Sequence, residues 1–251
     1  VESLLGLDPT GLPLALGIFA LLVAACGPPL LVGLDRGMAL LSKTAMGIAG
    51  GLLVYILLFG PTHFLMQGVL ESIGDYVTLV LPHGLRTYTF MDDHVDGWFR
   101  AWTLTFMVWW VAWAPFVGLF IARISRGGTI REFVVGVMLV PTAFSIVWFG
   151  VFGGIGFHGI REGVPVLEVV ERDVDATMFF VLDQFPVPTI TTAAVVLAAF
   201  LCVLTSLVSA SFVLGMFSTG GGLNPSRVVK LSWGAILGGL GLVMILSGGI
   251  D

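Results

Sequence analysis

Three tryptophans within five positions are the densest source of possible chemistry in this sequence: Trp109, Trp110 and Trp113. Trp109 and Trp113 are four residues apart, so they share one face of a helix, and Trp110 lies at the edge of that face. Indole faces attract cations, and quaternary ammonium groups are the best-known ligands of such aromatic cages. The spacing predicts a cation cage, with an aromatic belt or plain packing as the alternative. Pro115 and Gly118 follow within two turns and predict a weakened helix with free carbonyls.

A second group of polar side chains lies in an otherwise apolar segment and comprises Thr205, Ser206, Ser209 and Ser211. Hydroxyl oxygens combined with backbone carbonyls suit a hard monovalent cation such as Na⁺. Two alternatives remain open. The hydroxyls can bond to the carbonyl one helical turn back, or they can join neighbouring helices.

A compact basic loop, ARISRGGTIREF, covers residues 122–133 and contains Arg123, Arg126 and Arg131. Positive residues in short loops favour the cytoplasmic side of a membrane, which accounts for the charge. The charge alone does not explain the tight turn at Gly127 and Gly128.

The elements that must position these residues are membrane helices. The chain has 251 residues, of which 57% are hydrophobic and 11% are charged, whereas soluble domains carry about 25% charged residues. This composition excludes a soluble globular protein, a disordered chain and a nucleic-acid binder. The net charge of −5 also argues against nucleic acid as a partner.

Long stretches without Asp, Glu, Lys or Arg predict an all-α transmembrane fold, because a spanning helix needs about 20 mostly apolar residues. Residues 69–90 mix apolar and polar side chains and predict an interfacial amphipathic helix. The six predicted spans cover residues 13–33, 44–67, 101–122, 133–156, 188–217 and 230–249.

Loop charges predict the orientation of these spans. The loops on one side hold seven Lys and Arg against two acidic residues, and those on the other hold four against fourteen. The positive-inside rule places the first set in the cytoplasm and both chain ends outside. Because the chain also starts at Val1 with no signal-peptide pattern, we expect it to be part of a larger protein.

Enzymatic activity is disfavoured by what the spans contain. Apart from Lys230 at the edge of the last span, they carry no Asp, Glu, Lys or Arg, and His63 and His158 fall only near span ends. The sequence has neither the serine-hydrolase elbow nor the zinc-protease motif. A channel would need rings of charges or carbonyls, which the sequence does not suggest.

The residues described above resemble the signature of the betaine/choline/carnitine transporter (BCCT) family. The matching stretches are Trp109-Trp110, Trp113, Pro115-Phe116-Val117-Gly118 and FIARISRGGTIREF from Phe120, with further agreement at LLSKTAMGIAG from Leu40, LLFGPTHFL from Leu57 and LTSLVSAS from Leu204. The resemblance covers essentially the whole chain. It implies a LeuT-like inverted-repeat fold in which this chain is similar to the sixth through eleventh membrane helices.

By this resemblance the protein is a secondary transporter for a quaternary-ammonium solute such as glycine betaine or choline. The resemblance assigns Trp109, Trp110, Trp113 and Phe116 to substrate binding, Thr205 and Ser206 with a carbonyl near Cys202 to sodium, and Arg123, Arg126 and Arg131 to a gating loop. It implies no cofactor other than the coupling sodium ion. Its implied partners are the solute, the lipid bilayer of a bacterial inner membrane and, as among relatives, a homo-trimer.

Two alternatives and three departures accompany this interpretation. A proton-coupled or exchange-type member would carry choline, carnitine or a sulfonium solute, and a truncated or non-transporting sensor would bind without transport. The family usually has Asp at the position of Val208, Arg at that of Gly128 and often Trp at that of Met107. By the resemblance, Val208 affects a polar network near the sodium site, and Gly128 affects a contact of the loop.

Overall fold

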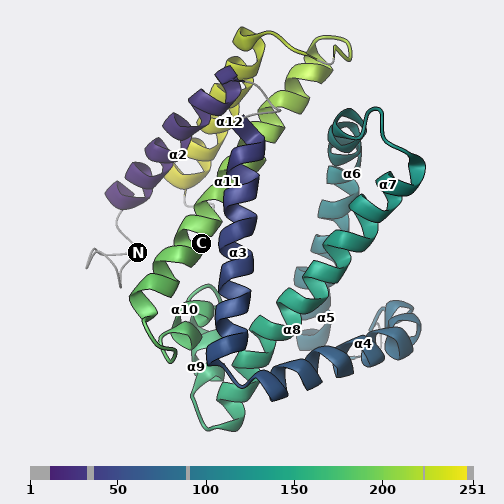
Figure 1. The fold of residues 1–251 in the computed structure, drawn as a ribbon, viewed down its shortest axis with the longest axis vertical. Coiled ribbons are helices and arrows are strands. Elements are labelled where there is room, and N and C mark those ends of the chain that lie inside the picture. The colour runs from purple at the N-terminus through teal and green to yellow at the C-terminus, as the bar shows by residue number, and fades with distance from the viewer. Residues whose placement is uncertain (1–11, 33–36, 89–90, 223, 248–251) are drawn as a thin grey trace. The chain divides into compact units, whose positions relative to one another are not determined.

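The computed structural model describes residues 12–32, 37–88, 91–222 and 224–247 (Figure 1). The described part does not include Val1 or the loop charges Asp35 and Arg36. It also omits the ends of three predicted helices, which are residues 33, 89–90 and 248–249. Every regular element in the described part is a helix. The chain divides into two compact units, residues 1–62 with 155–251 and residues 63–154.

The protein is an integral membrane protein, and seven of its described helical stretches have the length and apolarity to cross a bilayer. They are α2 (Leu12–Val32), α3 (Ala39–Phe59), α4 (Thr62–Gly84), α5 to α6 (Asp93–Ile124), α7 to α8 (Ile130–Arg161), α11 (Pro188–Ser218) and α12 (Arg227–Leu246). The sequence predicts six spans, and the additional stretch is α4. Its predicted position on the membrane surface stays a prediction.

The boundary between α3 and α4 differs from the predicted one. The sequence predicts a single span over 44–67, but α3 ends at Phe59 and α4 begins at Thr62. Gly60 is extended, with φ −94° and ψ −175°, because the residue before a proline is pushed out of the helical region. The predicted interfacial helix over 69–90 therefore starts earlier, at Thr62, and ends at Gly84.

In the first unit, α11 packs against α2, α3 and α12 (Figure 1). Its buried face includes Leu204 and Val208, which form an apolar cluster with Cys26 and Leu30 of α2. Glycines let α12 approach α2 closely, since a Cβ at Gly234 would lie 3.2 Å from Leu30 Cδ1. Small residues are what such helix contacts in membranes require.

Two short helices, α9 (Val166–Arg172) and α10 (Thr177–Leu182), connect α8 to α11. The end of α8 is closed by Gly163 in the left-handed region, with φ 83°, a position that glycine adopts without steric cost. The backbone N–H of Val164 then donates to Gly159 O at 2.9 Å. The chain turns back there, and buried Val166 packs beside Gly159.

In the second unit, α5 (Asp93–Trp98), a π-helical segment (Phe99–Leu104) and α6 (Thr105–Ile124) form one continuous helix. Asp92 caps it by accepting from the Val95 N–H at 3.0 Å. A second continuous helix joins α7 (Ile130–Val134), a π-helical segment (Val135–Leu139) and α8 (Val140–Arg161). Helices α4 and α8 touch where a Cβ at Gly150 would lie 2.6 Å from Val69 Cγ2.

We expect Gly150→Leu to destabilise the protein and Gly153→Leu to be tolerated. At Gly150 a larger side chain overlaps Val69, whereas no described residue has an atom within 4 Å of a Cβ at Gly153. Overpacking costs about 1–3 kcal/mol. Thermal unfolding in detergent, followed by size-exclusion chromatography, compares the two variants in the full-length protein. Equal unfolding temperatures would contradict the α4–α8 contact.

Candidate functional site

The predicted cage residues form a continuous line of aromatic rings along α6. Ring centroids lie 5.7 Å apart for Trp109 and Trp110 and also for Trp109 and Trp113. Phe116 continues the line at 5.2 Å from Trp113, with the ring planes 72° apart. Tilted and edge-to-face pairs of this kind are the favoured aromatic geometry. The structure therefore brings all four predicted substrate-binding side chains together.

A fifth ring belongs to this line. Phe106 lies 5.7 Å from Trp109 and 6.1 Å from Trp110. It is not among the residues predicted from the sequence, although it precedes the two tryptophans by three and four residues, a spacing that places side chains together on a helix. We call Phe106, Trp109, Trp110, Trp113 and Phe116 the aromatic line.

The helix that carries the aromatic line continues past Pro115 and Gly118 without a break. Helix α6 runs from Thr105 to Ile124 with Pro115 inside it. A proline inside a helix removes one donor, so its i−4 carbonyl, that of Val111, loses its usual partner. A carbonyl without its usual helical partner is what the sequence predicts at this point, and the weakening of the helix stays a prediction.

The indole faces remain accessible in the described part of the chain. Trp109 is 48% exposed and Trp110 is 54% exposed, while Trp113 and Phe116 are half-buried. Trp110 also lines a cavity of about 710 Å³ with Tyr76 of α4 and Ser145 of α8. Exposed indole faces at membrane depth offer cation–π contacts to a positively charged ligand.

The hydroxyl side chains predicted to bind sodium, those of Thr205 and Ser206, lie on α11 in the first unit. Thr205 Oγ1 donates to Cys202 O at 2.9 Å, which places two predicted sodium ligands next to each other. Ser209 Oγ donates to Thr205 O at 2.7 Å and Ser211 Oγ to Leu207 O at 2.8 Å. These bonds are the back-bonding alternative, yet each hydroxyl oxygen keeps lone pairs for a cation.

The two faces of α11 differ in what covers them. Leu201, Leu204 and Val208 are buried against neighbouring helices. Cys202 and Ser206 point the other way and are exposed, and Thr205 lies between the two faces. Within the described residues, the predicted sodium ligands therefore lie on the uncovered side of α11.

The departure at Val208 is explained by packing. Val208 is 1% exposed and belongs to the apolar cluster with Cys26, Leu30 and Leu204. Two residues along a helix correspond to a turn of about 200°, so Val208 and Ser206 face nearly opposite sides. The valine at this position extends the α2–α11 core and does not enter the face that carries Ser206.

We expect Val208→Asp to unfold the protein or lower its unfolding temperature strongly. The aspartate would place a carboxylate among three buried apolar side chains, those of Cys26, Leu30 and Leu204, and an unpaired buried charge costs several kcal/mol. Val208→Ala removes only two methyl groups and is the matched control, with a smaller loss. Unfolding temperatures in detergent measure both, and an unchanged value for Val208→Asp contradicts the burial.

The basic loop forms a tight turn between α6 and α7. Gly127 has φ 91° and Gly128 N–H donates to Ser125 O at 3.0 Å. Thr129 and Glu132 form a reciprocal capping box, in which Thr129 N–H donates to Glu132 Oε2 at 2.8 Å. The sequence carries a signal for this motif in its Thr-x-x-Glu spacing, which was not among the predicted features.

The three loop arginines differ in their surroundings. Arg123 is half-buried in the last turn of α6, where a positive charge complements the helix dipole. Arg126 and Arg131 lie on either side of the turn, and both are exposed. The turn and the capping box hold this loop in a compact conformation at the helix ends.

The similarity to known proteins extends over the complete chain. Residues 1–251 match the model of the family described as BCCT, betaine/carnitine/choline family transporter. A glycine betaine transporter of Bacillus subtilis is 38% identical over 87% of this chain and 42% of its own length. An ectoine/hydroxyectoine transporter of Virgibacillus pantothenticus is 34% identical over 87% of this chain and 43% of its own length.

An osmo-dependent choline transporter of Acinetobacter baylyi is 34% identical over 87% of this chain and 32% of its own length. The chain thus spans about two fifths or less of the length of these relatives. The solutes in their names are glycine betaine, ectoine with hydroxyectoine, and choline.

Proposed function

The chain belongs to the betaine/carnitine/choline family of transporters, and from this membership we propose that the full-length protein takes up a quaternary-ammonium compatible solute, such as glycine betaine or choline, coupled to sodium. The observation that carries the proposal is the aromatic line on α6, in which Trp109, Trp110, Trp113 and Phe116 follow one another at 5.2–5.7 Å. Relatives named as glycine betaine and choline transporters support the choice of solute.

In this proposal the aromatic line replaces water around the trimethylammonium group. A quaternary ammonium group donates no hydrogen bonds, so ring faces stabilise it through their quadrupole, at about 0.5–2 kcal/mol per ring. Trp109 and Trp113 share one face of α6 and supply the main contacts. Phe106 and Phe116 hold the indoles from both ends of the line.

Sodium would bind at Thr205, Ser206 and the Cys202 carbonyl. The Thr205 hydroxyl and the Cys202 carbonyl are already 2.9 Å apart, so they can converge on one small cation. A sodium ion that prefers one conformation of the transporter shifts the equilibrium toward it and thereby couples its gradient to solute uptake. Arg123, Arg126 and Arg131 would act in the cytoplasmic gating loop.

Uptake of radiolabelled glycine betaine and choline into proteoliposomes that contain the full-length protein tests this function. We expect saturable accumulation that needs an inward sodium gradient. Accumulation driven by a proton gradient without sodium would support the proton-coupled alternative. Binding without accumulation under any gradient would identify a sensor.

A further inference from the structure

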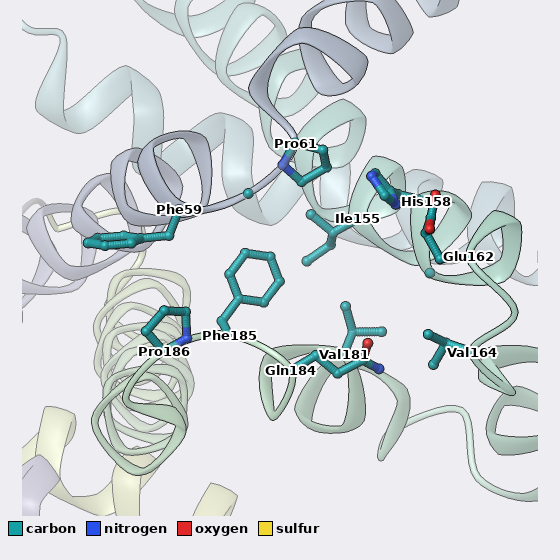
Figure 2. Close-up of a pocket in the computed structure, with 12 residues that line it drawn as sticks. Phe59, Pro61, Ile155, His158, Glu162, Val164, Val181, Gln184, Phe185 and Pro186 are labelled. Atoms are coloured by element: carbon teal, nitrogen blue, oxygen red, sulfur yellow. The ribbon is translucent and has the colours of Figure 1, made fainter.

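A separate cavity of about 330 Å³ lies in the first unit, at the ends of α3 and α8 and beside the turn that enters α11 (Figure 2). It contains neither the aromatic line nor the hydroxyls of α11. Small-molecule sites typically occupy about 300–1,000 Å³, so the cavity has room for one small solute. Figure 2 shows the rings of Phe59 and Phe185 on one side and His158 with Glu162 on another.

The aromatic side of this cavity is held in place by contacts within the unit. Tyr55 of α3 donates its hydroxyl proton to the carbonyl of Pro186. The Tyr55 ring lies 4.9 Å from Phe59 and 6.2 Å from Phe185. The turn at Phe185 and Pro186 is therefore tied to α3, and these contacts preorganise the aromatic wall.

The backbone of the turn that enters α11 also indicates that the aromatic wall is held in one conformation. Val187 has φ 52°, a left-handed conformation that is a genuine outlier for a β-branched residue. Pro188 follows it as the first residue of α11. On the same side of the cavity, next to Phe59, a Cβ at Gly60 would lie 3.2 Å from the Phe185 ring, so the glycine permits this close approach.

The polar side of the cavity is anionic. Glu162 follows His158 by four residues, so both side chains leave the same face of the α8 terminus. Among the described residues that line the cavity, Glu162 is the one carboxylate, and there is no lysine or arginine. The surrounding segment, residues 157–185, carries six acidic residues against two arginines, which favours a cationic occupant.

These features favour an organic cation over two other classes of ligand. A hard metal ion such as Ca²⁺ takes about six to eight oxygen ligands, and among the described lining residues Glu162 and Gln184 are the two that bring a carboxylate or amide oxygen. An inorganic anion would meet Glu162 without a compensating lysine or arginine in the described lining. A small organic cation gains both the ring faces and the carboxylate.

We propose that this cavity is a second binding site for a quaternary-ammonium solute, formed by Phe59, Phe185 and Glu162. The loop charges predict that it opens to the outside, so a solute would meet it before reaching α6. The identity of the solute rests on the proposed function. Gln184 supplies amide donors for the anionic end of a zwitterion such as glycine betaine.

Equilibrium dialysis of radiolabelled glycine betaine against the purified full-length protein tests this site. We expect wild type to bind two solutes and Glu162→Gln and Phe59→Leu each to bind one, or to weaken one site at least tenfold. Glu168→Gln, an exposed carboxylate on α9 outside the cavity, is the matched control and should retain both. Unchanged binding in Glu162→Gln and Phe59→Leu overturns the proposal.

Trp113→Ala separates this site from the proposed transport site. If Trp113→Ala removes one solute and Glu162→Gln removes the other, both proposals stand. If Trp113→Ala has no effect while Glu162→Gln removes binding, the α6 assignment fails and the second site remains. If Trp113→Ala removes all binding that wild type shows, the second site does not exist.

Discussion

Replacing Trp113 by alanine in the full-length protein is expected to raise the KM for glycine betaine roughly 2- to 30-fold, because each ring contributes about 0.5–2 kcal/mol to cation binding. Trp113 is central to the aromatic line, with Trp109 at 5.7 Å and Phe116 at 5.2 Å. Its loss removes one ring and releases two neighbours, so the upper part of this range is expected. Initial rates of radiolabelled uptake over a range of solute concentrations measure the change.

Trp102→Ala is the matched control, because Trp102 belongs to the same continuous helix and is 58% exposed, but lies outside the aromatic line. Its KM should equal that of wild type. Trp113→Phe keeps a ring and should give an intermediate KM. If Trp113→Ala and Trp102→Ala both show the wild-type KM, the substrate assignment of the aromatic line is wrong.

The double substitution Thr205→Ala and Ser206→Ala is expected to raise the sodium concentration for half-maximal uptake about tenfold or more. A polar contact to a charged group contributes about 1.5–3 kcal/mol, and each 1.4 kcal/mol corresponds to a factor of about ten. Thr205 also orients the Cys202 carbonyl through their 2.9 Å hydrogen bond. Uptake at fixed solute and varied sodium measures the effect.

The control for this experiment is Thr189→Ala, which removes a hydroxyl from the first turn of the same helix, away from Thr205. It should leave the sodium dependence unchanged. If the double variant keeps the wild-type sodium dependence, the assignment of Thr205 and Ser206 to the sodium site is wrong. A wild-type protein that responds to protons alone would contradict sodium coupling as a whole.

Part of the fold follows from local sequence chemistry. Long uncharged runs predict membrane helices, and α11 occupies Pro188–Ser218 where the sequence predicts residues 188–217. The spacing of Trp109 and Trp113 predicts a shared face, and their ring centroids lie 5.7 Å apart. Both inferences succeed because hydropathy and helical period act within one segment.

Other features depend on backbone geometry that hydropathy does not report. The apolar run through Gly60 and Pro61 reads as one span, yet the helix ends at Phe59, because a proline acts on the backbone and not on polarity. Pro115 lies inside α6 and leaves it unbroken. The same residue type therefore ends one helix and is tolerated in another, according to the surrounding backbone.

The sequence by itself determined that this chain is a helical membrane protein of a transporter family and which residues carry aromatic and hydroxyl chemistry. Tertiary structure decided that Val208 is buried with Cys26 and Leu30, that Cys202 and Ser206 lie on the open face of α11, and that Phe59, Phe185 and Glu162 surround one cavity. The physical reason is distance along the chain. Burial and cavities depend on which segments distant in the sequence pack against each helix. The helical periodicity of one segment contains no information about which other segment it packs against.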